Sequence, residues 1–274
     1  MTGPSERIPP AEHGARPRDL PPPPPLRPAR IGEPPLSLFL DFDGTLVEIA
    51  DHPDAVIVPP TLPGLIARLS DLLDGRLALV TGRSIAALEA LVGPLGVAVA
   101  GSHGGEFRPA GVSVAMALAD PLPGLAVERL TRFARENGGL LVEPKPFSIA
   151  VHYRTHPHAL NGLLACAEGV RHELGLTLKH GKQVIELAMP GSDKGSAVTR
   201  FMEMEPFAGS HPYFIGDDVT DEDAFAAIAR LGGEGVLVGP IRKTAASRRL
   251  DSVASVHRWL AEAFTATIEE NARG

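Results

Sequence analysis

Cysteine is nearly absent from this chain of 274 residues, and long hydrophobic runs are missing altogether. The single cysteine, Cys166, cannot form a disulfide within the chain, so nothing indicates an oxidising compartment. No apolar run is long enough to span a bilayer, and the N-terminus lacks the apolar segment of a signal peptide. We therefore expect a cytoplasmic protein with no membrane partner.

Positive charge is also in the minority. The chain has 26 Lys and Arg residues against 33 Asp and Glu residues, which gives a formal net charge of −7. This balance disfavours binding to nucleic acid, so we expect no nucleic-acid partner. An anionic small molecule remains possible as a ligand, because a bound cation can reverse the sign of a site locally.

Proline is distributed unevenly along the chain. Twelve of the 27 prolines lie within residues 1–35, including an unbroken run at residues 21–25. Proline favours extended polyproline II structure, and few apolar residues accompany it here to offset the entropy of ordering. We therefore expect residues 1–35 to form a disordered tail. A peptide that docks in an aromatic groove is the alternative interpretation.

The following part of the chain contains short apolar segments that end in polar residues. Segments with helical apolar spacing separate them, and this alternation predicts right-handed crossovers and a parallel sheet. The predicted fold class is α/β, with a Rossmann-like, doubly wound parallel-sheet core. The expected strands are residues 36–40, 76–80, 97–100, 212–215 and 236–238.

The pattern changes after residue 108. Residues 109–187 contain two helical segments and several strands with an antiparallel arrangement, beginning with a strand expected at residues 112–118. This mixture predicts a smaller α+β cap domain inserted into the core. The core would then comprise residues 36–108 and 188–266.

Two aspartates follow the first apolar strand directly. Asp41 and Asp43 lie two residues apart, and in open α/β sheets ligands bind just beyond the carboxyl ends of the strands. Two such carboxylates can converge on one hard cation such as magnesium. A loop in which the aspartates only solvate the strand end would explain one of them but explains the pair poorly.

Four polar signals stand in order along the core segments: Asp41-x-Asp43-Gly-Thr, Thr81, Lys194 and Gly216-Asp217-Asp218-x-x-Asp221. In this order they resemble the haloacid dehalogenase superfamily of phosphatases. The resemblance implies that Asp41 attacks phosphorus and that Asp43 is the general acid and base. It also implies that Thr81 and Lys194 bind the phosphoryl oxygens.

The same resemblance implies a Mg²⁺ cofactor. Asp41, Asp43 and Asp217 are the expected metal ligands, because hard cations prefer oxygen donors. Asp218 and Asp221 are expected to hold metal-bound waters or to orient Lys194. Asp221 has an ordinary alternative role, since an acidic residue in the first turn of a helix is common.

The insertion between Thr81 and Lys194 is long enough to form a domain. A cap inserted at this late position resembles that of the sugar phosphatases of the superfamily. Within that group, the chain is most similar to the trehalose-6-phosphate phosphatases. That resemblance implies that the cap residues Glu143, Lys145 and Glu186 bind sugar hydroxyls. The further substrate-binding residues expected are Arg83, Ser102, His103, Gly104 and Arg154. The supporting stretches are Thr81-Gly82-Arg83-Ser84, Gly101-Ser102-His103-Gly104, Glu143-Pro144-Lys145, His152-Tyr153-Arg154, Val184-Ile185-Glu186 and Gly216-Asp217-Asp218-Val219-Thr220-Asp221-Glu222.

The expected partner is therefore a small-molecule sugar phosphate, handled by a monomer. Two alternatives stay open: a related phosphatase that acts on sucrose phosphate or mannosyl-phosphoglycerate, and a non-catalytic protein that kept the fold. The joint presence of Asp41, Asp43, Lys194 and Asp217 disfavours the second. A phospho-acceptor receiver module also has strand-end aspartates, but it would lack the domain-sized insertion.

Overall fold

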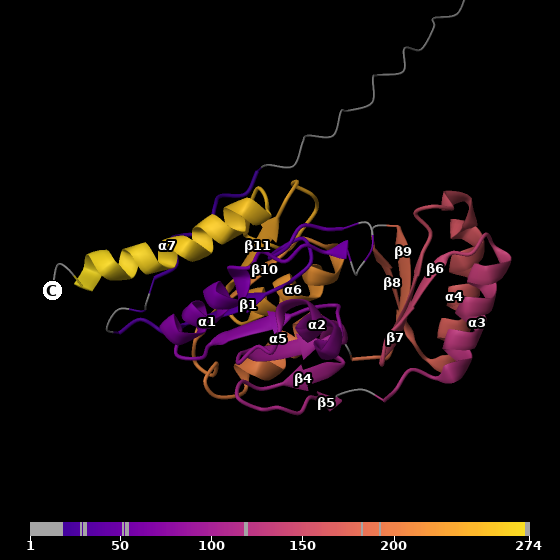
Figure 1. Ribbon diagram of the computed structural model, residues 1–274, viewed down its shortest axis with the longest axis horizontal. Helices are drawn as coiled ribbons and strands as arrows, with labels where there is room; N and C mark the ends of the chain where they lie inside the picture. Colours follow the sequence, from indigo (N-terminus) through magenta and orange to yellow (C-terminus); the bar gives the residue numbers. More distant parts are fainter. Residues whose placement is uncertain are drawn as a thin grey trace, which may run out of the picture.

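Two β-sheets organise the chain in the computed structural model, which describes residues 19–27, 29, 32–50, 52, 55–117, 120–181, 183–191 and 193–271. The larger sheet has eight strands in the order β12-β11-β10-β1-β2-β3-β4-β5, and the smaller has four in the order β6-β7-β9-β8. Figure 1 shows the two sheets as separate bodies joined by short connections. Among the described helices, none combines the length and apolar character that crossing a membrane requires.

The larger sheet forms the core, and its strands from β12 to β3 all pair in parallel. The strands are β1 (Leu36–Leu40), β2 (Leu77–Val80), β3 (Ala98–Gly101), β4 (Glu106–Arg108), β5 (Met116–Ala117), β10 (His211–Gly216), β11 (Glu234–Val238) and β12 (Arg248–Leu250). The helices are α1 (Leu62–Leu72), α2 (Ile85–Val92), α5 (Lys194–Met202), α6 (Glu222–Arg230) and α7 (Val253–Asn271).

Both faces of the core sheet are covered by helices. In β1, Leu38 and Leu40 belong to a buried cluster that includes residues of α1, α2 and α7. Phe39, which points to the opposite face, belongs to a second cluster with residues of α5 and α6. Each fully buried side chain of this size contributes about 1.5–3 kcal/mol. The doubly wound α/β prediction is confirmed.

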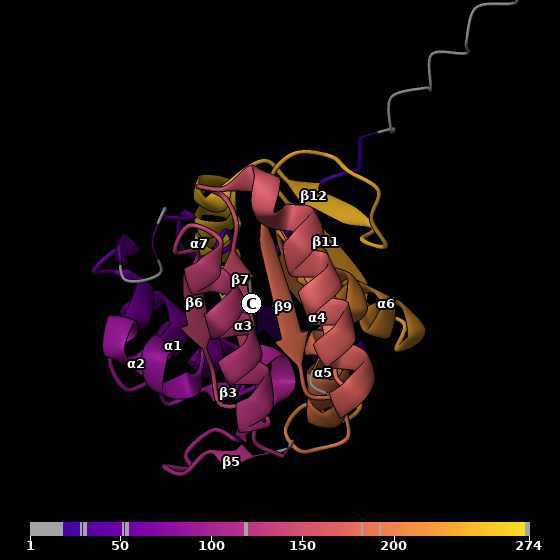
Figure 2. The same cartoon turned by 90° about the vertical axis from the view of Figure 1, so that its right-hand side faces the viewer.

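The smaller sheet and two helices form the cap. It consists of α3 (Gly124–Glu136), β6 (Leu141–Pro144), β7 (Ser148–His152), α4 (Leu160–Leu174), β8 (Thr177–Gly181) and β9 (Val184–Ala188). All neighbouring strands of this sheet are antiparallel. The two helices cover its outer face, as Figure 2 shows from the cap side, and the other face is turned toward the core (Figures 1 and 2).

The boundary between the two parts differs from the one expected. The strand predicted at residues 112–118 is shorter, and it pairs antiparallel with β4 at the end of the core sheet. Residues up to Ala117 therefore extend the core sheet, because β4 and β5 continue it beyond β3. At the other end, Ala188 still pairs within the cap sheet. We take residues 120–188 as the cap.

The proline-rich segment is ordered where the structure describes it. Within residues 19–27, Leu26 is buried and belongs to the core cluster that also contains Trp259. The Trp259 indole nitrogen donates a hydrogen bond to the carbonyl oxygen of Pro24. The expectation of disorder across residues 1–35 is therefore wrong for residues 19–27, because specific contacts offset the entropy of ordering. Residues 1–18 lie outside the described residues.

Candidate active site

The carboxyl ends of three adjacent strands bring the predicted core residues together. Strand β1 lies between β10 and β2, so Asp41, Asp217 and Thr81 emerge at one edge of the sheet. Gly44 allows Asp217 to come close, since a Cβ atom at this position would lie 2.3 Å from the Asp217 carboxylate carbon. Its φ of 81° also favours glycine.

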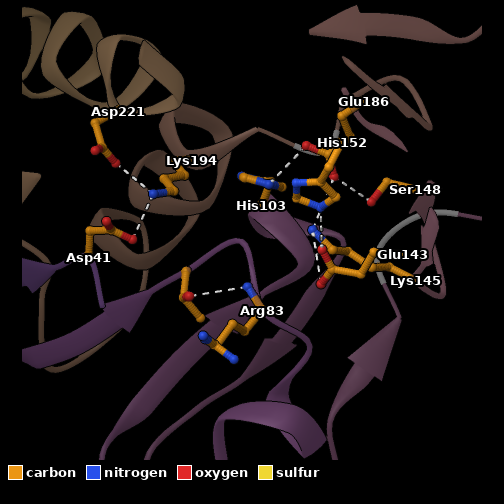
Figure 3. Close-up of polar contacts among 11 residues, drawn as sticks. Asp41, Arg83, His103, Glu143, Lys145, Ser148, His152, Glu186, Lys194 and Asp221 are labelled. Atoms are coloured by element: carbon orange, nitrogen blue, oxygen red, sulfur yellow. Dashed lines mark hydrogen bonds and ion pairs between the residues drawn. The ribbon is translucent and has the colours of Figure 1, made fainter. Parts of the chain in front are cut away.

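Lys194 joins two of the aspartates in the interior. It is the first residue of α5, whose N-terminus is capped by Asp193 through the backbone N–H of Ser196. The Lys194 Nζ atom lies 2.7 Å from Asp41 Oδ1 and 2.6 Å from Asp221 Oδ1 (Figure 3). Burial alone would lower the pKa of Lys194, but the two carboxylates outweigh it and raise that pKa. The lysine is therefore a fixed cation.

Three buried carboxylates converge around this lysine. Oxygen atoms of Asp41, Asp217 and Asp221 lie within 4.8 Å of one another. Burial raises the pKa of Asp41 well above its usual range, and the positive charge of Lys194 counteracts this only in part. The negative charges of Asp221 and Asp217 raise the pKa of Asp41 further. An all-oxygen donor set with this excess of negative charge fits a divalent metal ion. Asp221 belongs to this group of carboxylates and Asp43, which was expected as a ligand, does not, so the part of Asp43 in metal binding stays a prediction.

Asp43 instead forms a two-point ion pair with Arg83. The guanidinium Nε and one terminal nitrogen each lie 2.7 Å from a carboxylate oxygen of Asp43. The Arg83 backbone N–H donates to Thr81 Oγ1 at 3.1 Å, which fixes the turn that follows β2. Both carboxylate oxygens of Asp43 thus face Arg83, and Asp43 is not one of the three converging carboxylates.

A second polar cluster joins the cap to the core. His103, in the loop after β3, places Nε2 3.1 Å from Glu186 Oε2 of β9. Lys145 Nζ lies 3.5 Å from Glu186 and 3.8 Å from Glu143. His152 Nε2 lies 3.3 Å from Glu143 Oε2 (Figure 3). The cluster therefore alternates acidic and basic groups across the cap sheet.

The charges of this cluster depend on its burial. Burial lowers the pKa of His103, and the neighbouring charge of Glu186 opposes this effect in part. Burial would raise the pKa of Glu186, but the neighbouring His103 and Lys145 outweigh it and hold that pKa well below the usual range. The pKa of Lys145 is raised because Glu186 and Glu143 outweigh the effect of burial. Glu186 and Lys145 thus both remain charged.

A cavity of about 370 Å³ lies between the core cluster and the cap cluster. The predicted site residues that line it are Asp41, Asp43, Arg83, His103, Glu143, Lys145, Arg154, Lys194, Asp217 and Asp218. Phosphate-handling groups and sugar-binding candidates therefore face one space. Its volume lies in the range of about 300–1,000 Å³ that is typical of small-molecule sites.

Comparison with known proteins decides the family. Residues 39–254 match the family model described as trehalose-phosphatase. The chain belongs to the trehalose-phosphatase family. It is 39% identical over 235 residues to the trehalose-6-phosphate phosphatase of Escherichia coli (strain K12), and this match covers 85% of the chain and 87% of that protein.

Solved structures show the same fold as this trehalose-phosphatase family member. The C-terminal domain of the Candida albicans trehalose-6-phosphate phosphatase superposes with a TM-score of 0.73 at 23% identity, covering 82% of this chain and 91% of that one. A haloacid dehalogenase-like hydrolase from Bacteroides thetaiotaomicron gives a TM-score of 0.58 at 18% identity, covering 84% and 98%. The resemblance to the trehalose-phosphatase family is confirmed by the family model and the E. coli relative, and these structures show that the fold is shared.

Some predicted residues of this phosphatase do not line the cavity. Thr81 and Ser102 are buried beside it, and Gly104 packs against the backbone of Asp193. Glu186 and Asp221 do not line the cavity themselves. Glu186 pairs with His103 and Lys145, and Asp221 pairs with Lys194, and these three basic residues do line it.

Two residues escaped the sequence analysis. Ser148 Oγ donates a hydrogen bond of 2.7 Å to Glu186 Oε1, and a serine in a strand carries no signal of such a role. Arg242 donates to the backbone carbonyl of Asp218 at 2.7 Å and pairs with Glu222. The sequence did offer one signal for this contact: Arg242 follows β11, and β11 lies next to β10, which Asp218 follows.

Proposed function

We propose that this protein hydrolyses trehalose 6-phosphate to trehalose and phosphate, the last step of trehalose biosynthesis. The observation that carries the proposal is the shared cavity, which has Asp41 and Lys194 on its core side and Glu143 and Lys145 on its cap side. The core groups suit a phosphate ester, and the alternating charges of the cap suit a polyhydroxylated sugar. The E. coli relative carries the matching name.

The first half-reaction transfers the phosphoryl group to the enzyme. A carboxylate oxygen of Asp41 attacks phosphorus, the bond from phosphorus to the sugar oxygen breaks, and an aspartyl-phosphate forms. For this step Asp43 leaves its ion pair with Arg83 and carries a proton, which it donates to the departing sugar oxygen. Lys194 contributes a fixed positive charge beside the attacking carboxylate, where charge on the phosphoryl oxygens must be stabilised.

The second half-reaction restores the carboxylate. Asp43, now deprotonated, accepts a proton from a water molecule that attacks the aspartyl-phosphate, and inorganic phosphate leaves. Arg83 pairs with Asp43 once its proton has been given up, and both residues line the cavity. Thr81 orders the same turn through its bond to the Arg83 amide.

Mg²⁺ is the metal that we propose for the buried carboxylates. Asp41, Asp217 and Asp221 would hold it, and Asp218 directly follows Asp217 after β10. The bound ion supplies positive charge that reduces the repulsion between Asp41 and a phosphate dianion. We further propose that the enzyme works as a cytoplasmic monomer, since all the groups named come from one chain.

Phosphate release from a panel of sugar phosphates tests the proposal. The panel contains trehalose 6-phosphate, sucrose 6-phosphate, mannosyl-3-phosphoglycerate and glucose 6-phosphate, with Asp41→Asn as the control variant. We expect trehalose 6-phosphate to give the highest kcat/KM and Asp41→Asn to be inactive, because an amide is a poor nucleophile. A higher kcat/KM for another sugar phosphate would assign that substrate instead. No turnover of any panel member would indicate a non-catalytic protein.

A further inference from the structure

Residues 19–27 turn one side toward the core with a period of three. Pro23 and Leu26 are buried, and Leu20 is partly buried and packs against the core cluster that contains Phe225. The intervening residues at 21, 22, 24 and 25 are exposed. Polyproline II helices repeat every three residues, so this burial pattern matches one face of such a helix. In Figure 1 the segment is the indigo trace beside α7.

The segment also contacts the core through polar groups at three points. The Trp259 indole N–H donates to the Pro24 carbonyl oxygen at 2.8 Å, and the backbone N–H of Arg249 donates to the Pro21 carbonyl oxygen at 3.0 Å. The Arg249 guanidinium reaches both carboxylate oxygens of Asp19, at 2.6 and 3.0 Å. Polyproline II carbonyls make no internal hydrogen bonds, so they are available to donors of this kind.

We propose that β12 and the first half of α7 form a binding groove for a proline-rich peptide, with residues 19–27 as its occupant in the same chain. The ligand class is a polyproline II segment with an acidic residue at its N-terminal end and apolar residues at every third position. Grooves lined by aromatic residues recognise such segments. A polyproline II segment is already extended before it binds, so it loses little conformational entropy on binding.

The position of the groove gives the occupant a physical role. Strand β12 is the edge of the eight-stranded sheet, and exposed edges present unpaired backbone groups to other chains. The Arg249 amide of this edge is satisfied by Pro21. The prolines have no N–H to offer a further strand, so pairing ends with them. This role is independent of the proposed phosphatase reaction.

The single tryptophan makes the groove directly measurable. Trp259 is the sole tryptophan of the chain and is 5% exposed, so all tryptophan emission comes from this one side chain, which contacts the segment. The test uses the full chain with Asp19→Ala and Leu26→Ser combined, which removes the ion pair and one apolar anchor. We expect red-shifted emission and easier quenching by acrylamide. A synthetic peptide with the sequence of residues 19–27 should reverse both changes saturably.

Matched controls separate the groove from general effects. Adding Arg249→Ala to the loosened chain should weaken peptide binding by about tenfold or more, since a two-point charged contact is lost. Adding Arg248→Ala should leave binding unchanged, because Arg248 pairs with Glu234 and not with the segment. A peptide with serine at the positions of Leu20 and Leu26 should not restore the emission.

Three results would overturn the proposal: unchanged Trp259 emission in the loosened chain, no reversal by the peptide, or equal reversal by the serine-substituted peptide. If the double variant does not fold, as judged by circular dichroism, Asp19→Asn alone takes its place in the full chain. Exchange of the Trp259 indole proton should then be faster than in the wild-type protein. Equal exchange rates would reject the groove.

Discussion

Ser148 donates a buried hydrogen bond to Glu186 across neighbouring strands of the cap sheet, with an oxygen–oxygen distance of 2.7 Å. The other oxygen of Glu186 faces His103 of the core at 3.1 Å. Glu186 is therefore fixed from two sides, by Ser148 within the cap and by His103 of the core. Glu186 therefore fixes His103 and Lys145, which line the cavity, before any sugar arrives, and this reduces the entropy lost on binding.

We predict that Glu143→Ala or Glu186→Ala lowers kcat/KM for trehalose 6-phosphate at least about tenfold. Glu143 lines the cavity, and a hydrogen bond to a charged group contributes roughly 1.5–3 kcal/mol, whereas Glu186 acts by holding His103 and Lys145 in place. Ser148→Ala should act mainly through KM, since Glu186 remains but loses its orientation. Hydrolysis of p-nitrophenyl phosphate, which offers no sugar hydroxyls, is the control and should change far less. Equal losses on both substrates would mean that these residues serve only the folding of the cap.

The charge of Glu186 also predicts a pH dependence of stability. Its pKa in the folded protein is well below the ordinary value of 4.5, because His103 and Lys145 outweigh the effect of burial. A depressed pKa contributes stability that is complete above pH 4.5 and is lost as the pH falls toward the folded value. Urea unfolding of wild type and Glu186→Gln should therefore show a difference in unfolding free energy that shrinks below pH 4.5. Parallel curves down to pH 3 would contradict this assignment.

Metal binding can be separated from turnover. We predict that a chelator abolishes activity and that Mg²⁺ restores it, since oxygen ligands suit a hard cation. Mg²⁺ at about 100 times its Kd should stabilise the wild-type protein by about 2.7 kcal/mol, seen as a higher Tm. Asp217→Asn should lose this Tm shift.

Asp43→Asn is the informative comparison for the metal. Its carboxylate is held by Arg83 and lies outside the group of three converging carboxylates. We therefore expect Asp43→Asn to keep the Mg²⁺-dependent Tm shift while losing turnover. Loss of the shift would support the prediction from the sequence that Asp43 is one of the metal ligands.

The strand-end residues were predictable because backbone periodicity alone places them. A buried strand followed by Asp41 and another followed by Asp217 must meet if the sheet is parallel, and the structure places them together. The partners of Asp43 and Glu186 were not predictable, because the contacts of Arg83 and His103 depend on how loops and domains meet in space. Ser148 gives no sequence signal, since serine is common in strands.

The proline-rich segment shows a different limit of the sequence. Composition indicated disorder, because few apolar residues accompany the prolines. The period of three formed by Leu20, Pro23 and Leu26 was visible, but its partner Trp259 lies far along the chain. A polyproline II segment makes no internal hydrogen bonds, so its order depends on contacts with another part of the chain, here Trp259.

Removal of residues 1–27 should consequently destabilise the protein. The deletion exposes the apolar surface under Pro23 and Leu26 and leaves the Trp259 indole and the Arg249 amide to water. Burial of one such side chain contributes about 1.5–3 kcal/mol and each hydrogen bond about 0.5–1.5 kcal/mol, so a loss of roughly 3 kcal/mol is expected. For a chain of this size that corresponds to a fall in Tm of about 6–12 °C.

Leu26→Ala in the full chain should produce part of this fall, through the cavity that it creates. Scanning calorimetry measures both effects, and an unchanged Tm after the deletion would show that the segment contributes nothing to the folded core. Trehalose 6-phosphate turnover at 25 °C should persist in the deleted protein, since none of the cavity residues belongs to the segment.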